Sequence, residues 1–170
     1  MKETEQGAIL KYMDITNEWT KKDKKGSLVE RSSYIVDGNN YIVDGKHVIL
    51  RPSEKERAVA TILSEQYGKQ VELIPQIMHP QGIQTPDYLI DGERFDLKCF
   101  ESAGKHVIYN LISKKKNQSP NFIFDMTECP LSLEEIESQI AGVYSSTHTR
   151  FVNEIIVMRN GKIIKAYRRQ

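Results

Sequence analysis

The sequence lacks the features of a membrane protein and of a small disulfide-bonded secreted domain. No apolar run approaches the ~20 residues that cross a bilayer, and the opening Met-Lys-Glu-Thr-Glu is not a signal peptide. Only two cysteines occur, Cys99 and Cys129, and their spacing is typical of neither a redox motif nor a metal site. We therefore expect a soluble protein without membrane contact, with reduced thiols in its core.

A large excess of charge of either sign is also missing. The 24 lysines and arginines balance 23 aspartates and glutamates, for a net charge of +1. Any nucleic-acid binding must therefore come from local basic patches. The length of 170 residues and the hydrophobic fraction of 39% suit one domain with its own core. We predict a flexible arm or linker over 1–31 and the domain itself over 32–170.

Helix and turn signals alternate along the chain. Two capping boxes, Ser53 with Glu56 and Ser132 with Glu135, each precede apolar residues at helical spacing. Ser102 is a candidate cap for a further helix ending in three lysines, and residues 34–50 suggest a three-stranded meander. Asn160-Gly161 predicts a closing hairpin. Together these signals predict an α+β fold with a largely antiparallel central sheet, containing hairpins and packed against two or three helices.

The segment 85–98 is the most informative part of the chain. A two-residue turn at Asp91-Gly92 pairs Tyr88 with Phe95 and sets Asp87 opposite Asp96. Side-chain alternation then places Asp87, Asp96 and Lys98 on one polar face, behind an apolar one. Two opposed carboxylates repel unless a cation or a proton lies between them. The polar face of the hairpin is therefore a candidate functional site.

The same residues resemble the PD-(D/E)xK signature of metal-dependent nucleases. Pro86-Asp87 and Asp96-Leu97-Lys98 match it, and Asp87 and Asp96 would then hold a divalent metal such as magnesium or zinc. Such nucleases often add a glutamate from a preceding helix, and Glu56 is available. The capping box explains Glu56 without a metal, so both interpretations of this residue stay open.

More of the chain resembles another group of nucleases. Tyr67-Gly68-Lys69, residues 71–75, residues 85–98 and the final hairpin follow each other as in certain C-terminal toxin domains. These domains end contact-dependent growth inhibition proteins and some phage head-morphogenesis proteins. They are assigned to the barnase–EndoU–colicin–RelE superfamily of metal-independent ribonucleases, many of which cut tRNA. In this chain Asp96 replaces the usual glutamate before Lys98.

This second resemblance implies partners and a location as well as an activity. It implies RNA as the substrate, with tRNA foremost, no cofactor, and a cognate immunity protein that covers the site. It also implies delivery within a larger secreted or phage protein into the cytoplasm of a target cell.

Ribonuclease chemistry needs a general base, a general acid and cations for the phosphate. The run Ser146-Thr147-His148-Thr149-Arg150 gathers these groups, although such runs also form ordinary loops. Asp96 could orient His148 or pair with Arg150. The predicted catalytic residues are Lys98, His148, Thr147, Arg150 and Asp96. The predicted substrate-binding residues are Ser146, Thr149, Lys114, Lys115 and His106.

Three hypotheses result from the sequence. The first is a metal-independent ribonuclease that attacks through the 2′-hydroxyl. The second is a metal-dependent nuclease that uses Asp87, Asp96 and Lys98. The third is a module that binds nucleic acid or a partner protein without catalysis.

Overall fold

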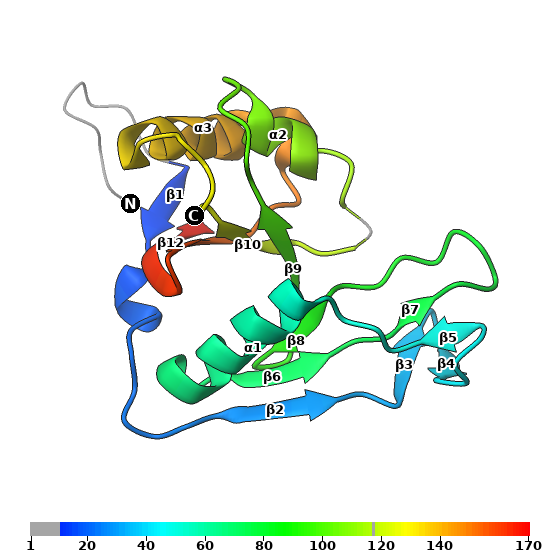
Figure 1. Ribbon diagram of the computed structural model, residues 1–170. Coiled ribbons are helices and arrows are strands. Elements are labelled where there is room, and N and C mark those ends of the chain that lie inside the picture. Colours follow the sequence, from blue (N-terminus) through cyan, green and yellow to red (C-terminus); the bar gives the residue numbers. More distant parts are fainter. Residues whose placement is uncertain (1–10, 117) are drawn as a thin grey trace. The chain divides into compact units, whose positions relative to one another are not determined.

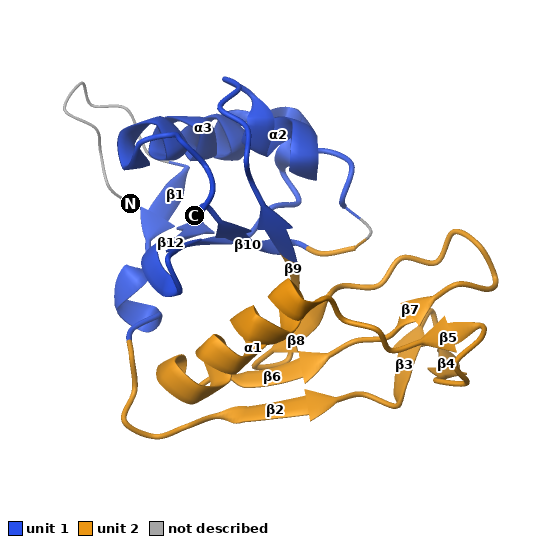
Figure 2. Cartoon of the chain, in the orientation of Figure 1, with its two compact units in different colours: residues 1–20, 97–116, 120–170 blue, residues 21–96, 117–119 orange. Residues whose placement is uncertain are grey.

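The computed structural model describes residues 11–116 and 118–170, which form two compact units (Figure 2). Of the described residues, unit 1 comprises 11–20, 97–116 and 120–170, and unit 2 comprises 21–96 and 118–119. Strand β9, Glu93–Cys99, starts in unit 2 and ends in unit 1.

Unit 2 contains a sheet against which one helix packs (Figure 1). Its strand order is β2-β6-β8-β9; β2 and β6 run parallel, and the other pairs are antiparallel. The bounds are β2 Ser27–Glu30, β6 Gln70–Leu73, β8 Tyr88–Ile90 and helix α1 Glu54–Tyr67. The predicted pairing of Tyr88 with Phe95 is confirmed, and Asp91 and Gly92 have the positive φ angles of a type I′ turn.

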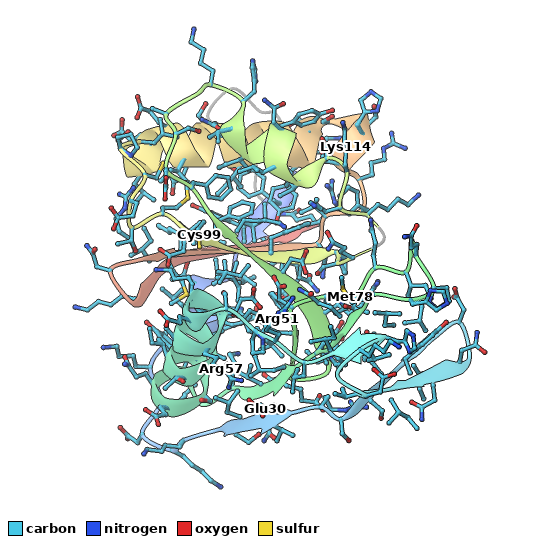
Figure 3. The ribbon with its side chains drawn as sticks, turned by 45° about the vertical axis from the view of Figure 1, so that its right-hand side comes forward. Glu30, Arg51, Arg57, Met78, Cys99 and Lys114 are labelled. Carbon is cyan, nitrogen blue, oxygen red and sulfur yellow. The ribbon has the colours of Figure 1, made fainter. Side chains whose placement is uncertain are left out.

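Helix α1 begins and ends where the sequence predicts. Ser53 accepts a hydrogen bond from the Glu56 N–H, and Gly68 ends the helix in the left-handed conformation. The buried face includes Val59, Ala60 and Leu63. Across the helix surface, Arg57 forms an ion pair with Glu30 of β2, and both side chains are labelled in Figure 3.

The predicted meander over 34–50 is only partly correct. Strands β3, Ser33–Val36, and β4, Asn39–Ile42, form a hairpin. Strand β5, Val48–Ile49, instead pairs with β7, Gln76–Ile77, which comes after α1. A partner so far along the chain leaves no local signal, so a sequence repeat suggests the nearer pairing.

In unit 1 the strand order is β1-β12-β11-β10, and two helices pack on these strands (Figure 1). Its strands are β1 Tyr12–Asp14, β10 Asn121–Asp125, β11 Glu154–Arg159 and β12 Lys162–Arg169. Its helices are α2 Val107–Ile112 and α3 Leu133–Ser145, with short 3-10 turns η1 Thr16–Glu18 and η2 Thr147–Thr149. A core that includes Phe122, Phe124 and Ile140 joins these elements.

Two details of unit 1 test the sequence-based interpretation. The closing hairpin is confirmed, with positive φ angles at Asn160 and Gly161. The helix expected after Ser102 is present, but its predicted bounds are wrong, because α2 starts after His106 and ends at Ile112, before the three lysines. Cys129 is buried as expected, whereas Cys99 is exposed rather than part of the core.

The α+β class with largely antiparallel pairing is confirmed, and three α-helices lie in the described part of the chain. Within the predicted arm, residues 1–10 lie outside the described part, while residues 12–14 and 27–30 pair as strands. The boundary at 31/32 stays a prediction. None of the helices in the described ranges has the length and apolar character of a bilayer crossing.

Candidate functional site

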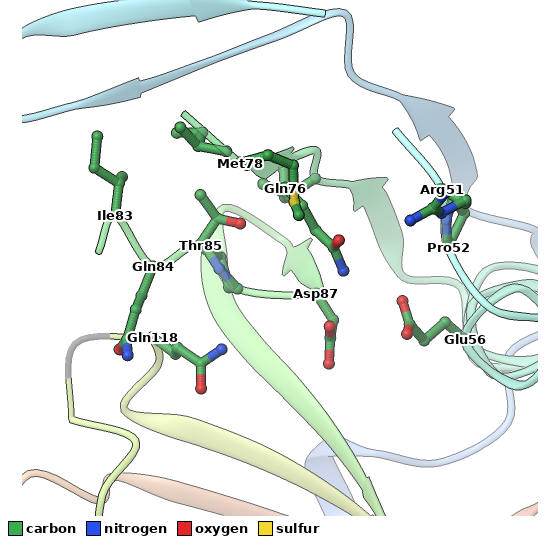
Figure 4. Close-up of a pocket in the computed structure, with 13 residues that line it drawn as sticks. Arg51, Pro52, Glu56, Gln76, Met78, Ile83, Gln84, Thr85, Asp87 and Gln118 are labelled. Carbon is green, nitrogen blue, oxygen red and sulfur yellow. The ribbon is translucent and has the colours of Figure 1, made fainter. Parts of the chain in front are cut away.

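Unit 2 contains a small polar cavity at the start of the central hairpin (Figure 4). Its volume is about 210 Å³. The polar groups that line it are Arg51, Glu56, Gln76, Gln84, Thr85, Asp87 and Gln118. A volume below the ~300 Å³ of ordinary ligand pockets suits a phosphate group or a hydrated ion better than a whole nucleotide.

Asp87 is held in this cavity by its backbone. Its N–H donates to Oδ1 of Asp96 at 3.0 Å, and its carbonyl accepts from the Ile74 N–H at 3.2 Å. This hydrogen bond places the carboxyl group of Asp96 beside the Asp87 backbone, and Asp96 is 1% exposed. Strand β8 begins one residue later, at Tyr88, so Asp87 precedes the ladder and its side chain lines the cavity.

Glu56 reaches the same cavity from the first turn of α1. Its N–H donates to Oγ of Ser53, the N-cap residue, at 3.1 Å. Its carbonyl accepts a hydrogen bond from the hydroxyl of the fully buried Tyr88 at 2.7 Å. Figure 4 shows its carboxylate extending from the helix towards Asp87 and Arg51. The backbone contacts fix the helix start, so the carboxylate position follows from the fold.

The capping-box interpretation of Glu56 is only half right. In α3 the box is complete, because Oε2 of Glu135 accepts from the Ser132 N–H at 2.8 Å. At α1 only the serine half of the box forms among the described residues, and the Glu56 carboxylate lines the cavity instead. The capping box therefore does not account for the Glu56 carboxylate, and a metal-binding role stays open for it.

Gln118 adds an unexpected oxygen to the cavity wall. Its Oε1 atom is buried and accepts no hydrogen bond within the described part of the chain. A buried acceptor left unsatisfied costs about 1–3 kcal/mol, so such atoms often mark a water, ion or ligand site. No local sequence signal identifies Gln118, because only the fold brings this connecting segment to the hairpin.

The donor set fits a hard divalent cation. Carboxylate and amide oxygens are what magnesium prefers, and magnesium is commonly held by one or two carboxylates, with waters and substrate phosphates completing its shell. No group of three or more histidine, cysteine or acidic side chains with ligand geometry occurs in the described ranges. A metal here would therefore depend on Glu56, Asp87 and substrate oxygens.

Lys98 lies two residues beyond Asp96 on β9 and is half-buried. Side-chain alternation puts Asp96 and Lys98 on the same side of this strand, as the sequence predicts. Asp96 belongs to unit 2 and Lys98 to unit 1.

The serine- and threonine-rich run forms the end of α3 and the turn η2 in unit 1. Thr147, His148 and Arg150 are exposed, and Ser146 caps the turn by accepting from the His148 N–H at 3.3 Å. Thr149 is buried and donates its hydroxyl to the Val143 carbonyl at 2.6 Å. That bond gives Thr149 a structural role, and the proposed contact with substrate stays a prediction.

The remaining predicted RNA contacts also lie in unit 1. His106 precedes α2 and lines a shallow cavity of about 350 Å³ between α2 and α3. Lys114 is exposed (Figure 3) and Lys115 is half-buried, and both follow the end of α2. Asp96 lies in unit 2, whereas His148 and Arg150, which it was predicted to orient or pair with, lie in unit 1.

Comparisons with known proteins complete the description. No curated protein sequence matches the chain. A solved "CdiA-CT/CdiI toxin and immunity complex from Burkholderia pseudomallei" contains a chain with the same fold, with a TM-score of 0.55 and 24% sequence identity over 82% of this chain and 98% of that one. Residues 84–163, which begin just before Asp87, match the family model described as the contact-dependent growth inhibition CdiA C-terminal domain.

Proposed function

We propose that this chain is a toxin domain that hydrolyses phosphodiester bonds of nucleic acid at the cavity of unit 2, with a divalent metal. The observation that carries the proposal is that Glu56 and Asp87 line one small polar cavity, with the buried Asp96 bonded to the Asp87 backbone. The proposal favours the metal-dependent hypothesis over the metal-independent one, since the structure leaves the Glu56 carboxylate at the cavity rather than at the helix cap.

Each residue then has a definite task. Glu56 and Asp87 would hold the cation through their carboxylate oxygens, and Asp96 keeps Asp87 in place through the 3.0 Å bond to its N–H. When bound, a divalent cation would supply positive charge to the phosphate and lower the pKa of water. The exposed Arg51 at the cavity wall attracts the phosphate. The catalytic role of Lys98, which belongs to unit 1, stays a prediction.

RNA, and tRNA in particular, is the substrate that we propose. The net charge of +1 means that attraction depends on local cations such as Arg51, Lys114 and Lys115. A metal-independent ribonuclease centred on His148 stays the competing prediction. It makes the opposite prediction for chelation, so one experiment decides between the two.

The match of residues 84–163 to a C-terminal toxin domain and the fold shared with a toxin chain support the toxin assignment. We infer by analogy that a cognate immunity protein binds this chain and that a larger protein delivers it into the cytoplasm of target cells. The immunity protein should be acidic where it covers Arg51, since charge complementarity speeds association.

The decisive measurement is cleavage of total tRNA by purified protein in EDTA, and again with added Mg²⁺, Mn²⁺ or Zn²⁺. We expect no cleavage in EDTA and full recovery with at least one metal. Manganese titration by calorimetry should show binding to the wild type that Asp87→Asn removes, which tests the metal site independently of activity. Cleavage in EDTA that leaves 2′,3′-cyclic phosphate ends and requires His148 would refute this proposal. Tight RNA binding without cleavage under any metal would instead support the non-catalytic module.

A further inference from the structure

A second, larger cavity of unit 2 adjoins the one described above. Its volume is about 550 Å³, within the ~300–1,000 Å³ typical of small-molecule sites. The two cavities share Ile83, Gln84 and Pro86 as walls. A ligand group in one therefore lies next to a group in the other. We call the larger one the Tyr34 cavity.

The walls of the Tyr34 cavity combine flat and apolar surfaces. Tyr34, from β3, and Arg94, from β9, line it together with residues Ile35 and Val36. The Tyr34 ring is half-buried. Burial raises the pKa of the Tyr34 hydroxyl, and the nearby positive charge of Arg94 partly opposes this rise. An aromatic ring and a guanidinium plane are the two surfaces on which unpaired nucleobases stack.

Polar groups border these surfaces. Asp37 and Gln84 also line the cavity, and both are exposed. A carboxylate and an amide can accept and donate the hydrogen bonds that base edges offer. Asp37 has a φ of 50° and precedes Gly38 in the turn of the β3–β4 hairpin, so its backbone is fixed. The cavity thus offers both faces and edges to a planar heterocycle.

We propose that the Tyr34 cavity binds the base of an unpaired nucleotide adjacent to the phosphate held at Glu56 and Asp87. This inference rests on the proposed function, since it takes the smaller cavity as the phosphate site. A concave pocket receives a base only when that base is free of its stack and pairing partner. The substrate segment is therefore single-stranded, or opens on binding.

The test measures binding in EDTA, where metal-dependent cleavage is absent. The probe is a fluorescein-labelled single-stranded RNA octamer, and the readout is fluorescence anisotropy. We expect Tyr34→Ala to weaken binding about tenfold, since base–aromatic stacking contributes ~1–3 kcal/mol per base. Tyr34→Trp should retain or strengthen binding, and Arg94→Gln should weaken it severalfold.

Tyr41→Ala is the matched control for the hairpin. Tyr41 faces Tyr34 across the β3–β4 ladder but does not line the cavity. We expect near-wild-type affinity from this variant. An equal loss in Tyr41→Ala and Tyr34→Ala would overturn the proposal, because it would trace the effect to hairpin folding.

Abasic octamers identify the contact itself. Replacing one base with an abasic site should cost the wild type about as much as Tyr34→Ala does, and the two changes together should cost no more than either alone. Additive losses at every position would overturn the proposal. A DNA octamer distinguishes recognition of the base from recognition of the 2′-hydroxyl. Because none of these measurements depends on cleavage, they can succeed or fail independently of the metal test.

Discussion

The starts of helices α1 and α3 share a Ser-x-x-Glu pattern but use it differently. At α3, the side chains of Ser132 and Glu135 each accept a hydrogen bond from the other residue's backbone N–H, which completes the helix cap. At α1, Ser53 caps the helix while Glu56 lines a cavity opposite Asp87. One glutamate stabilises its own helix, and the other is available to a ligand. The same local sequence therefore has a structural role in unit 1 and a candidate functional role in unit 2.

The surroundings explain the difference. The Tyr88 hydroxyl donates a hydrogen bond to the Glu56 carbonyl at 2.7 Å. This bond helps to hold the start of α1 beside the hairpin of β8 and β9. Loss of the reciprocal cap lowers the free energy of unfolding by about 1 kcal/mol. A ligand that binds the folded protein at this site would offset that loss. Sites commonly sacrifice local stability in this way.

The largest expected difference between the two glutamates is in activity. Glu56→Gln should lower tRNA cleavage at least about 100-fold, because it removes a charged oxygen from the phosphate site. Glu135→Gln should leave cleavage unchanged, since glutamine still caps the helix. The measurement is the initial rate at saturating metal. Equal rates for the two variants would remove Glu56 from the proposed site.

Metal should stabilise the wild type and not a ligand variant. A cation that binds only the folded state at 100 times its dissociation constant adds about 2.7 kcal/mol to the free energy of unfolding. We expect Mn²⁺ to raise the melting temperature of the wild type and of Glu135→Gln, with no shift for Asp87→Asn. Differential scanning fluorimetry is sufficient, and a shift that persists in Asp87→Asn would place the metal elsewhere.

Tyr88→Phe should loosen the start of α1. It removes the donor to the Glu56 carbonyl at a buried position, which costs about 1–2 kcal/mol. Urea unfolding followed by circular dichroism measures this loss. Cleavage should fall by less than tenfold, since Glu56 stays present but is held less firmly.

The smallest expected effect is on stability, where substitution of Glu135 should matter more than substitution of Glu56. Glu135→Ala should lower the free energy of unfolding by about 1 kcal/mol more than Glu56→Ala, because both lose a negative charge at a helix start but only Glu135 loses a backbone hydrogen bond. The same urea experiment measures both variants. A greater loss from Glu56→Ala would mean that its carboxylate supports the fold after all.

The sequence was sufficient wherever an element depends on neighbouring residues. The hairpin register around Asp91-Gly92, the serine caps at Ser53 and Ser132, and the closing turn at Asn160-Gly161 all depend on local geometry. The predicted start of the helix after Ser102 was wrong because this helix depends on contacts with distant residues. α2 is a short helix with the wrong predicted start, and its buried residues Ile108 and Ile112 contribute to a core assembled from distant segments.

The residues of the candidate site also differ in whether a local sequence signal identifies them. The sequence placed Asp87 beside Asp96 because a local turn sets the hairpin register, and the structure has the Asp87 N–H bonded to Asp96. The functional roles predicted for these residues and for Lys98 stay predictions. Gln118 and Tyr34 were missed, since they reach unit 2 cavities from separate parts of the chain. The sequence predicted a complete capping box at Glu56, whereas only the serine half of it forms.

The pairing of β1 with β12 has a consequence for the order in which the protein becomes complete. Tyr12 pairs with Arg169, so the strands of unit 1 join residues from opposite ends of the described chain, whereas the strands of unit 2 have all been made once β9 ends at Cys99. A chain emerging from a ribosome can therefore form the sheet of unit 2 while unit 1 still waits for its last strand. Removing the eight residues of β12 would take away the strand between β1 and β11. Synthesis must reach the far end of the domain before unit 1 can close.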